Sequence, residues 1–536
     1  MLTHTLMIAA ALAAPQGDSV PLYTDLGNHH HAISTTVPAA QAYFDQGLRL
    51  VYGFNHAEAI RSFRAAQRLD PGCGMCWWGE ALAFGPNLNA AMDSASAVAA
   101  HVATRGALAR LDGATAKERA YVRALAERYG AEPVAERARR DTAYARAMDA
   151  VAREYPGDED ARVLAADAHM NLSPWDYYLE GKRPKPNAAT ALAHLETVLA
   201  RNADHAGACH FFIHAVEAAH PERAVPCAER LPSLMPGAGH IVHMPAHVYI
   251  RVGRYADAID RNIHAVHADE QHMADMAPDG VYRLAYYPHN YHFLWFAATM
   301  AGRAELAIQS ARNTAAKTNR DLMREPDLAA LQHYVMTPLF ALVRFGRWEE
   351  IFAEPAPPSD LPYMTGIWHY ARAVAQAALG RFDAAETELA GLRAAAASPA
   401  LEGTIWGFNS VASVLHVAIE AAAGDIAYRR GDVDRAIVHY RRGVELEDTM
   451  TYDEPPTWHL PVRHQLGAAL LAAGAVAQAE RVYREDLERH PENGWSLTGL
   501  AAALAALDRH QEAEAVTQRL HQAWRGADVT LTSSRF

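Results

Sequence analysis

The stretch AQAYFDQGLRLVYGFNHAEAIRSFRAAQRLDPGC, from Ala40 to Cys73, decides the fold. Its apolar residues recur at spacings of three and four, which is typical of amphipathic helices. Gly47 is a small residue in the first half, Ala59 and Phe63 lie in the second half, and Pro71 ends the segment. We therefore expect two helices that pack closely against each other through their small residues.

The chain beyond residue 40 has the same helical character throughout. It is rich in Ala, Leu, Arg and Glu and has few β-branched runs. The segment from Leu460 to Asn493 repeats the opening pattern through Gly467, Leu470, Ala479 and Tyr483. From Gly253 onward a glycine turn returns at intervals of 34 to 51 residues, and the last one lies inside this second segment. These turn glycines are Gly253, Gly302, Gly346, Gly380, Gly431 and Gly474.

Both segments resemble tetratricopeptide repeats, and weaker matches fill most of the chain between them. The resemblance implies an all-α solenoid of helix–turn–helix repeats, wound as a right-handed superhelix. It also implies that the first helix of each repeat lines a concave groove. Such a fold predicts a binding surface but does not say what binds there.

The expected organisation follows from this repeat pattern. It comprises a signal peptide (1–20), an N-terminal arm (21–39), N-terminal repeats with insertions (40–204), central histidine-rich repeats (205–330), C-terminal repeats (331–525) and a tail (526–536). Irregular inserts are expected at Ala90–Ala114, Ser173–Asn187, His272–Tyr287 and Ala394–Gly407.

Composition limits the partners. The 536 residues carry a net charge of −13 and contain no basic block, so we predict no nucleic-acid partner. No run of 18 apolar residues follows the N-terminus, which predicts no integral membrane segment. The groove favours a small molecule or a peptide as ligand, and the oligomeric state is left open.

The N-terminus predicts a location. Met1–Ala14 resembles a short bacterial secretion signal, although its usual positive region is missing. We expect a periplasmic or secreted protein, with a cytoplasmic one as the alternative. Export would let Cys73 and Cys76 oxidise. Trp77 follows this CxxC pair, which excludes covalent haem attachment, and a structural disulfide or buried thiols are favoured over redox catalysis.

Histidines are concentrated in the middle of the chain. Twelve of the 29 lie between His205 and His292, where an even spread would place about five. Several stand at i, i+3, i+4 or i+7, so each set shares one face of a helix. The predicted ligands on these faces are His210, His214, Glu217, His240, His243, His247, His289 and His292.

The repeat register brings most of these faces to the groove. Taking the glycine turns as a ruler, His240 and His289 are second residues of their repeats, and His243 and His292 are fifth residues. By the resemblance these positions face the groove, as does the ninth position, which His247 occupies, and Asp167 is a ninth residue as well. Adjacent packed helices lie 8–10 Å apart, so imidazoles from neighbouring repeats can reach one ion.

The sequence therefore predicts a metal site in the groove for copper, iron or zinc, with enough histidines to hold two ions. The protein would be a metalloprotein that also acts as an enzyme, a metal-handling protein without turnover, or a non-enzymatic scaffold that binds a peptide or protein. A histidine-lined groove that binds an acidic or aromatic partner is a further alternative. No catalytic residue and no other cofactor are predicted. The run from His29 to His31 is interpreted as tag-like or disordered, or as an arm that reaches back to the metals.

Overall fold

The computed structural model describes residues 20–130, 132, 136–274 and 280–536. The predicted signal segment lies outside these residues, as does the middle of the expected insert at 272–287. The chain divides into two compact units. We call residues 20–248 and 263–287 the N-terminal unit, and residues 249–262 and 288–536 the C-terminal unit. The division falls inside the segment predicted as central repeats.

The N-terminal unit is helical. Its helices are α1 (Pro38–Tyr52), α2 (His56–Leu69), α3 (Gly74–Ala83), α4 (Ser94–Leu108), α5 (Ala116–Arg128), α6 (Arg137–Glu154), α7 (Glu159–Met170), η1 (Glu180–Lys182), α8 (Pro186–Leu199), α9 (Ala206–Val216), η2 (Pro221–Ala224), α10 (Val225–Leu234), α11 (Gly239–His243) and the π-helical turn η3 (Tyr282–Tyr286). Helices α12 (Pro245–Arg251) and α13 (Tyr255–His272) contain residues of both units, and α14 (Tyr287–Met300) begins with the last residue of the N-terminal unit, Tyr287.

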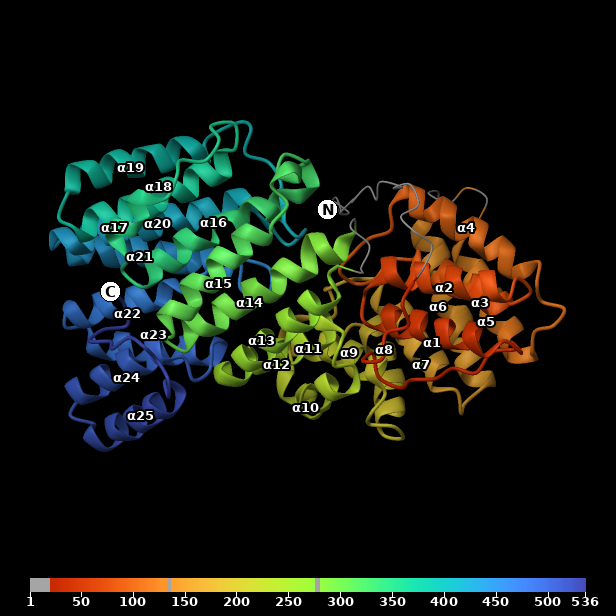
Figure 1. Ribbon diagram of the computed structural model, residues 1–536. Coiled ribbons are helices and arrows are strands. Elements are labelled where there is room, and N and C mark those ends of the chain that lie inside the picture. Colours follow the sequence, from red (N-terminus) through yellow and green to blue (C-terminus); the bar gives the residue numbers. More distant parts are fainter. Residues whose placement is uncertain (1–19, 131, 133–135, 275–279) are drawn as a thin grey trace. The chain divides into compact units, whose positions relative to one another are not determined.

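The C-terminal unit is also built from helices (Figure 1). They are α14 (Tyr287–Met300), α15 (Ala304–Lys317), η4 (Arg320–Leu322), η5 (Pro326–Leu328), α16 (Ala329–Arg344), α17 (Trp348–Ala353), α18 (Pro362–Ala378), α19 (Phe382–Ala396), α20 (Val411–Arg430), α21 (Val433–Asp448), α22 (Val462–Ala472), α23 (Val476–Arg489), α24 (Gly494–Ala506) and α25 (His510–Ala523). In the described part of the chain the only strands are β1 (Thr404–Ile405) and β2 (Asn409–Ser410), which pair antiparallel.

Consecutive helices pack as hairpins, which confirms the all-α helix–turn–helix repeat fold. The small residues act as predicted. A Cβ atom added to Gly47 of α1 would lie 2.7 Å from the ring of Phe63 in α2, and one added to Gly79 of α3 would lie 2.3 Å from the same ring. Phe63 therefore fills a slot between α1 and α3 that only glycines leave open.

The same arrangement recurs near the other end of the chain. Tyr483 of α23 packs between Gly467 of α22 and Gly499 of α24, where added Cβ atoms would lie 2.4 and 2.1 Å from its ring. The six predicted turn glycines all adopt positive φ angles, between 66° and 89°. This left-handed conformation costs glycine little, which explains why the turns repeat as glycines.

The inserts differ in part from the prediction. Ala90–Ala114 is not irregular, because most of it forms α4, which packs with α3 as a repeat hairpin. Its Ala-rich sequence has only a weakly amphipathic pattern, which hid the helix. Ser173–Asn187 is irregular as expected, apart from η1 and its last two residues, which begin α8. Ala394–Gly407 leads into the β1–β2 hairpin.

Helix α20 is long and apolar enough, by length and composition, to pass a test for a membrane span. Its mean hydropathy is 1.3 over the window tested, but 67% of that window is buried inside the structure. It packs against α18, α19 and α21. These features are those of the core helix of a helical stack.

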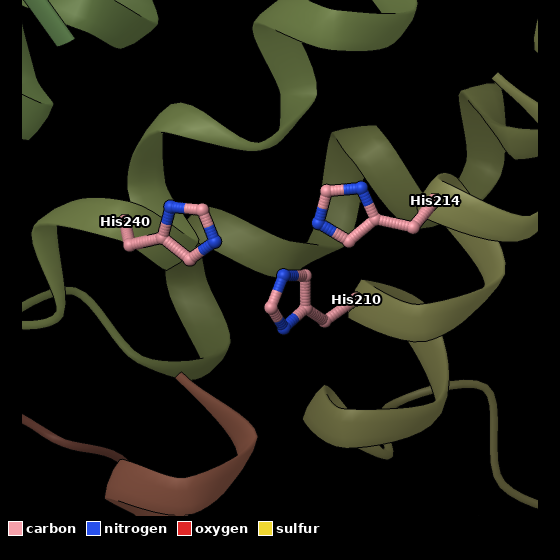
Figure 2. Close-up of side chains that lie close together, drawn as sticks. All are labelled: His210, His214 and His240. Carbon is pink, nitrogen blue, oxygen red and sulfur yellow. The ribbon is translucent and has the colours of Figure 1, made fainter. Parts of the chain in front are cut away.

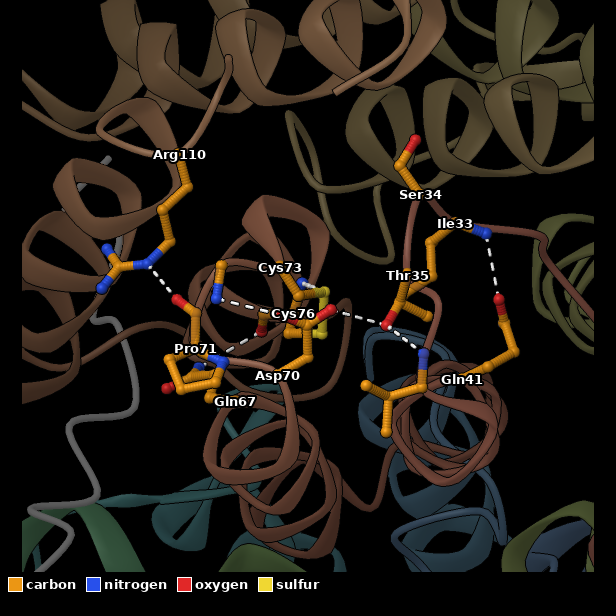
Figure 3. The surroundings of a disulfide bond; sticks show 12 residues. Ile33, Ser34, Thr35, Gln41, Gln67, Asp70, Pro71, Cys73, Cys76 and Arg110 are labelled. Carbon is orange, nitrogen blue, oxygen red and sulfur yellow. Dashed lines mark hydrogen bonds between the residues drawn. A yellow bond between two sulfur atoms is a disulfide. The ribbon is translucent and has the colours of Figure 1, made fainter. Parts of the chain in front are cut away.

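The N-terminal arm is tied to the first hairpin. Figure 3 shows Ile33, Ser34 and Thr35 lying beside the start of α3. The Ile33 N–H donates to Gln41 Oε1 (3.0 Å), and Thr35 Oγ1 donates to Asp70 Oδ2 (2.6 Å). Cys73 and Cys76 form a disulfide at the same place, which is one of the two states that the sequence left open. The arm is therefore part of the N-terminal unit.

Candidate metal centre

Helix α9 carries the first two predicted ligands. His210 and His214 stand one turn apart, and all residues of this short, apolar helix are buried. The helix begins after His205, whose Nδ1 accepts the backbone N–H of Ala208 at 3.2 Å and so caps its first turn. Both imidazoles are therefore fixed on a rigid element inside the unit.

The second group of ligands lies on α11 and α12. The sequence predicted one continuous helix for His240, His243 and His247, but the helix is interrupted at Met244. Pro245 has no N–H to donate to the preceding turn, so the helix restarts there. Across this interruption His243 Nε2 lies 2.9 Å from His247 Nε2.

His210, His214 and His240 meet in one place (Figure 2). One ring nitrogen from each lies within 4.8 Å of the others. The ring centroids of His210 and His214 are 4.9 Å apart, and those of His210 and His240 are 5.0 Å apart. Two helices, α9 and α11, therefore direct three imidazoles toward one point, within the range over which a single ion could bind them.

The proton positions on two of these rings suit metal binding. His210 Nδ1 donates to the carbonyl oxygen of Tyr52 (2.6 Å), and His214 Nδ1 donates to Glu217 Oε1 (3.0 Å). A neutral ring that donates from Nδ1 has its lone pair on Nε2. Both Nε2 atoms, and both ring nitrogens of His240, are buried and have no hydrogen-bond partner among the described residues.

Glu217 joins the two groups of histidines. Its Oε1 accepts from His214, and its Oε2 lies 3.1 Å from His247 Nδ1. Burial alone would raise the pKa of this carboxyl, but His247 and His214 outweigh burial and hold the pKa below its ordinary value. An ionised Glu217 therefore orients both rings, in the way that carboxylates orient metal-binding histidines.

The histidines themselves are held neutral. Burial, reinforced by neighbouring imidazoles, lowers the pKa of His210 and His240 well below the ordinary histidine value. Burial also lowers the pKa of His214, although Glu217 opposes it. Neutral imidazole is the form that binds a metal ion.

Aromatic rings enclose the cluster. Phe54 stacks on His214 and His240 at centroid distances of 5.9 and 5.6 Å and contacts His210 at 4.4 Å. Tyr286 covers His240 from another side, at 4.5 Å. Phe54 is buried and has a positive φ of 56°. These walls surround the imidazoles with apolar surface.

Two predicted ligands, His289 and His292, belong to the C-terminal unit. His289 Nδ1 lies 3.4 Å from the hydroxyl of Tyr334. His292 is buried, with its ring 4.9 Å from Trp295 and 5.7 Å from His333. Among the described residues of this unit, His292 belongs to no group of three ligand residues close enough to share an ion.

Asp167 was expected to face the groove beside the histidines. Its carboxylate accepts from Asn171 Nδ2 at 2.9 Å, and in the described chain it is not part of the histidine cluster. Sequence reasoning also missed three contributors. Phe54 and the Tyr52 carbonyl carry no motif, and His205 was counted among the clustered histidines without a role.

The interpretation of His29–His31 as a tag-like or disordered stretch is wrong. His29 Nε2 and His31 Nδ1 lie 2.9 and 2.7 Å from the two oxygens of Asp160, and His30 Nδ1 lies 2.7 Å from Asp45 Oδ2. The run is held in place because each of its three imidazoles contacts a carboxylate. The long sequence separation from Asp160 hid this pairing.

The comparisons with known proteins add little beyond these observations. No family model matches the chain, and no curated protein matches it. Among solved structures, the human IFIT1 dimer with m7Gppp-AAAA is 12% identical, with a TM-score of 0.32 over 92% of this chain and 91% of that chain. The TPR domain of P58(IPK) is 13% identical, with a TM-score of 0.24 over 88% of this chain and 99% of that chain.

Proposed function

We propose that the N-terminal unit binds a transition metal ion through His210, His214 and His240. The observation that carries the proposal is the convergence of three buried imidazoles with unpartnered ring nitrogens within 4.8 Å. Burying such groups without a partner is costly, so a structure that gathers several of them favours a ligand that satisfies them together.

The surroundings of the rings support a metal rather than water. The Tyr52 carbonyl and the Glu217 carboxylate accept the Nδ1 protons and leave the Nε2 lone pairs pointing inward. Metal-binding histidines almost always donate their other N–H in this way. A site that merely held water would not need both rings in the same tautomer.

The ligand set indicates the class of metal. Three imidazoles with a nearby carboxylate suit zinc, copper or iron. The pair His243 and His247, with Glu217 beside it, could hold a second ion next to the first. The proposal is thus a histidine-rich transition-metal protein on a repeat scaffold, as an enzyme or as a metal carrier.

The cellular location is proposed on separate grounds. The Cys73–Cys76 disulfide suits an oxidising compartment, such as the periplasm or the outside of the cell. Intact mass measured under non-reducing conditions on protein from its native compartment should be lower, by two hydrogens, than after reduction. Free thiols at both positions in that protein would contradict the proposal.

Elemental analysis and thermal unfolding test metal binding. We expect untagged protein to hold zinc, copper or iron after exposure to each metal and removal of excess. Metal should stabilise the fold by about 2.7 kcal/mol at a hundred times its dissociation constant.

The variant His214→Ala should lose most of this thermal shift. His510→Ala is the matched control, because His510 is exposed on α25 in the other unit. Each variant is compared with its own metal-free form, so a change in intrinsic stability does not interfere. A shift that survives His214→Ala, or protein that takes up none of the three metals, would contradict the proposal.

A further inference from the structure

A second cluster of ligating side chains surrounds Asp160, in the first turn of α7. This carboxylate is only 6% exposed. His29 Nε2 lies 2.9 Å and His205 Nε2 lies 3.3 Å from its Oδ1, while His31 Nδ1 lies 2.7 Å from its Oδ2. The hydroxyl of Tyr52 donates to Oδ1 at 2.5 Å. The N-terminal arm, α1, α7 and α9 thus meet at one carboxylate.

A cavity of about 480 Å³ opens beside this cluster. The carboxylate side chains that line it outnumber the lysines. They are Asp158, Glu159, Asp160 and Asp204, against the single lysine Lys117. Lys117 is already paired with Asp158 at 2.8 Å. The excess of carboxylates means that the cavity favours a cation.

We propose that His29, His205 and Asp160 form a second metal-binding site, open to this cavity. One ligand atom from each lies within 4.8 Å of the others. Neighbouring ligand atoms around an ion at 2.0–2.1 Å are about 2.9 Å apart in octahedral and about 3.3 Å apart in tetrahedral geometry. The distances from Asp160 Oδ1 to the two imidazole nitrogens, 2.9 and 3.3 Å, lie within the range that these two geometries span.

The ligand chemistry differs from that of the buried cluster. Two imidazoles and one carboxylate with open positions form the set used by mononuclear Fe(II) and zinc sites that bind exogenous ligands. His31 and Tyr52 donate to the carboxylate and would hold it in place, as outer partners of metal ligands do. The open positions would face the cavity, where a small polar molecule could reach the ion.

The hydrogen bonds also predict a difference in affinity. His205 Nδ1 accepts the Ala208 N–H, so its neutral ring carries the proton on Nε2. Binding a metal through Nε2 would move that proton and end the bond from Ala208. At His210 and His214 no such exchange is needed, because Nδ1 already donates. The site at Asp160 should therefore bind the same metal more weakly than the buried cluster.

A cobalt titration of the untagged, full-length protein tests the site. Bound Co²⁺ is counted by equilibrium dialysis and followed by its visible absorption. We expect His29→Gln to bind one Co²⁺ fewer than the wild type, with the weaker class of binding lost. The glutamine amide can still donate to Asp160, so the arm should stay docked, and circular dichroism checks the fold.

His30→Gln is the matched control. His30 is the adjacent histidine on the same arm, but it pairs with Asp45 and lies outside the ligand set. It should bind as many Co²⁺ ions as the wild type. Loss of one ion in both variants would mean that the histidine run binds metal as a surface tag does, and would overturn the inference. An unchanged count in His29→Gln would also overturn it.

The variant His214→Ala separates this inference from the proposed function. It should lose the tighter binding at the buried cluster and keep the weaker site. If His29→Gln loses one ion while His214→Ala loses none, the site at Asp160 stands and the buried cluster does not. The reverse pattern would leave only the buried cluster. Asp160→Asn, checked for folding, should reproduce the loss seen in His29→Gln.

Discussion

At the scale of single residues, the position of one proton separates histidines that can bind a metal as they stand from one that must first move its proton. His210 and His205 lie on or next to the same helix, yet His210 donates from Nδ1 and His205 accepts at Nδ1. Sequence spacing showed that His210 and His214 share a helix face. It could not show these tautomers, because the acceptor of His210 is the distant Tyr52 carbonyl and because spacing does not say which ring nitrogen of His214 faces Glu217.

Glu217 should set the affinity of the buried cluster. Glu217→Gln removes the charge that orients His214 and His247, and loss of such an outer partner typically lowers metal affinity by about 10- to 100-fold. Competition with a chelator measures the change. Glu222→Gln, at an exposed glutamate on η2, is the control and should bind as the wild type does. Equal affinity in all three proteins would mean that Glu217 does not position the ligands.

Asp167 should make the fold less stable as the pH rises. Burial raises the pKa of its carboxyl to about 6, against the opposing effects of Arg128 and Asn171. Below the unfolded-state pKa, near 4, both states are protonated. Between pH 4 and 6 only the unfolded state loses its proton. The free energy of unfolding therefore falls by about 3 kcal/mol, and the decrease is complete above pH 6.

Asp167→Asn removes this dependence and keeps an oxygen that can accept from Asn171. The free energy of unfolding of the variant, relative to wild type, should rise by about 3 kcal/mol from pH 4 to pH 7. Urea denaturation at each pH measures it, and the exposed Asp508→Asn is the control. A difference between variant and wild type that stays constant with pH would disprove the assignment.

At the scale of helices, the repeat pattern predicted most of the fold. Small residues at Gly47 and Gly467 mark the close helix contacts, and the turn glycines mark the hairpin ends. The pattern did not predict one helix boundary, which is set by a proline, and one helix, which has weak amphipathicity. Pro245 splits the helix expected to carry three histidines, and α4 was taken for an irregular insert.

The close helix contacts can be tested with a pair of glycines. In Gly47→Ala the new methyl group would overlap the Phe63 ring, which should cost about 1–3 kcal/mol of unfolding free energy. In Gly113→Ala the added Cβ meets nothing within 4 Å, so the variant should be about as stable as wild type. Chemical denaturation of both variants and the wild type measures these differences in the free energy of unfolding. A fully stable Gly47→Ala would contradict the packing described for α1 and α2.

At the scale of the whole molecule, the sequence showed that histidines are concentrated in one stretch of the chain, but not how they are distributed between the two compact units. Twelve histidines lie within one stretch of sequence, yet the two compact units divide that stretch, and His289 and His292 belong to the C-terminal unit. The pairing of His29 and His31 with Asp160 spans about a quarter of the chain. No periodicity reports such contacts, because they depend on how the hairpins stack.

The central claim is that imidazoles from α9 and α11 share one ion. X-ray absorption at the zinc edge tests it most directly, on the His29→Gln variant loaded with one equivalent of zinc, so that only the buried cluster is occupied. We predict a first shell dominated by nitrogen at about 2.0–2.1 Å, with the outer-shell scattering of about three imidazoles. A shell of oxygen alone, or imidazole scattering that is unchanged in the same protein carrying His240→Ala, would contradict the claim.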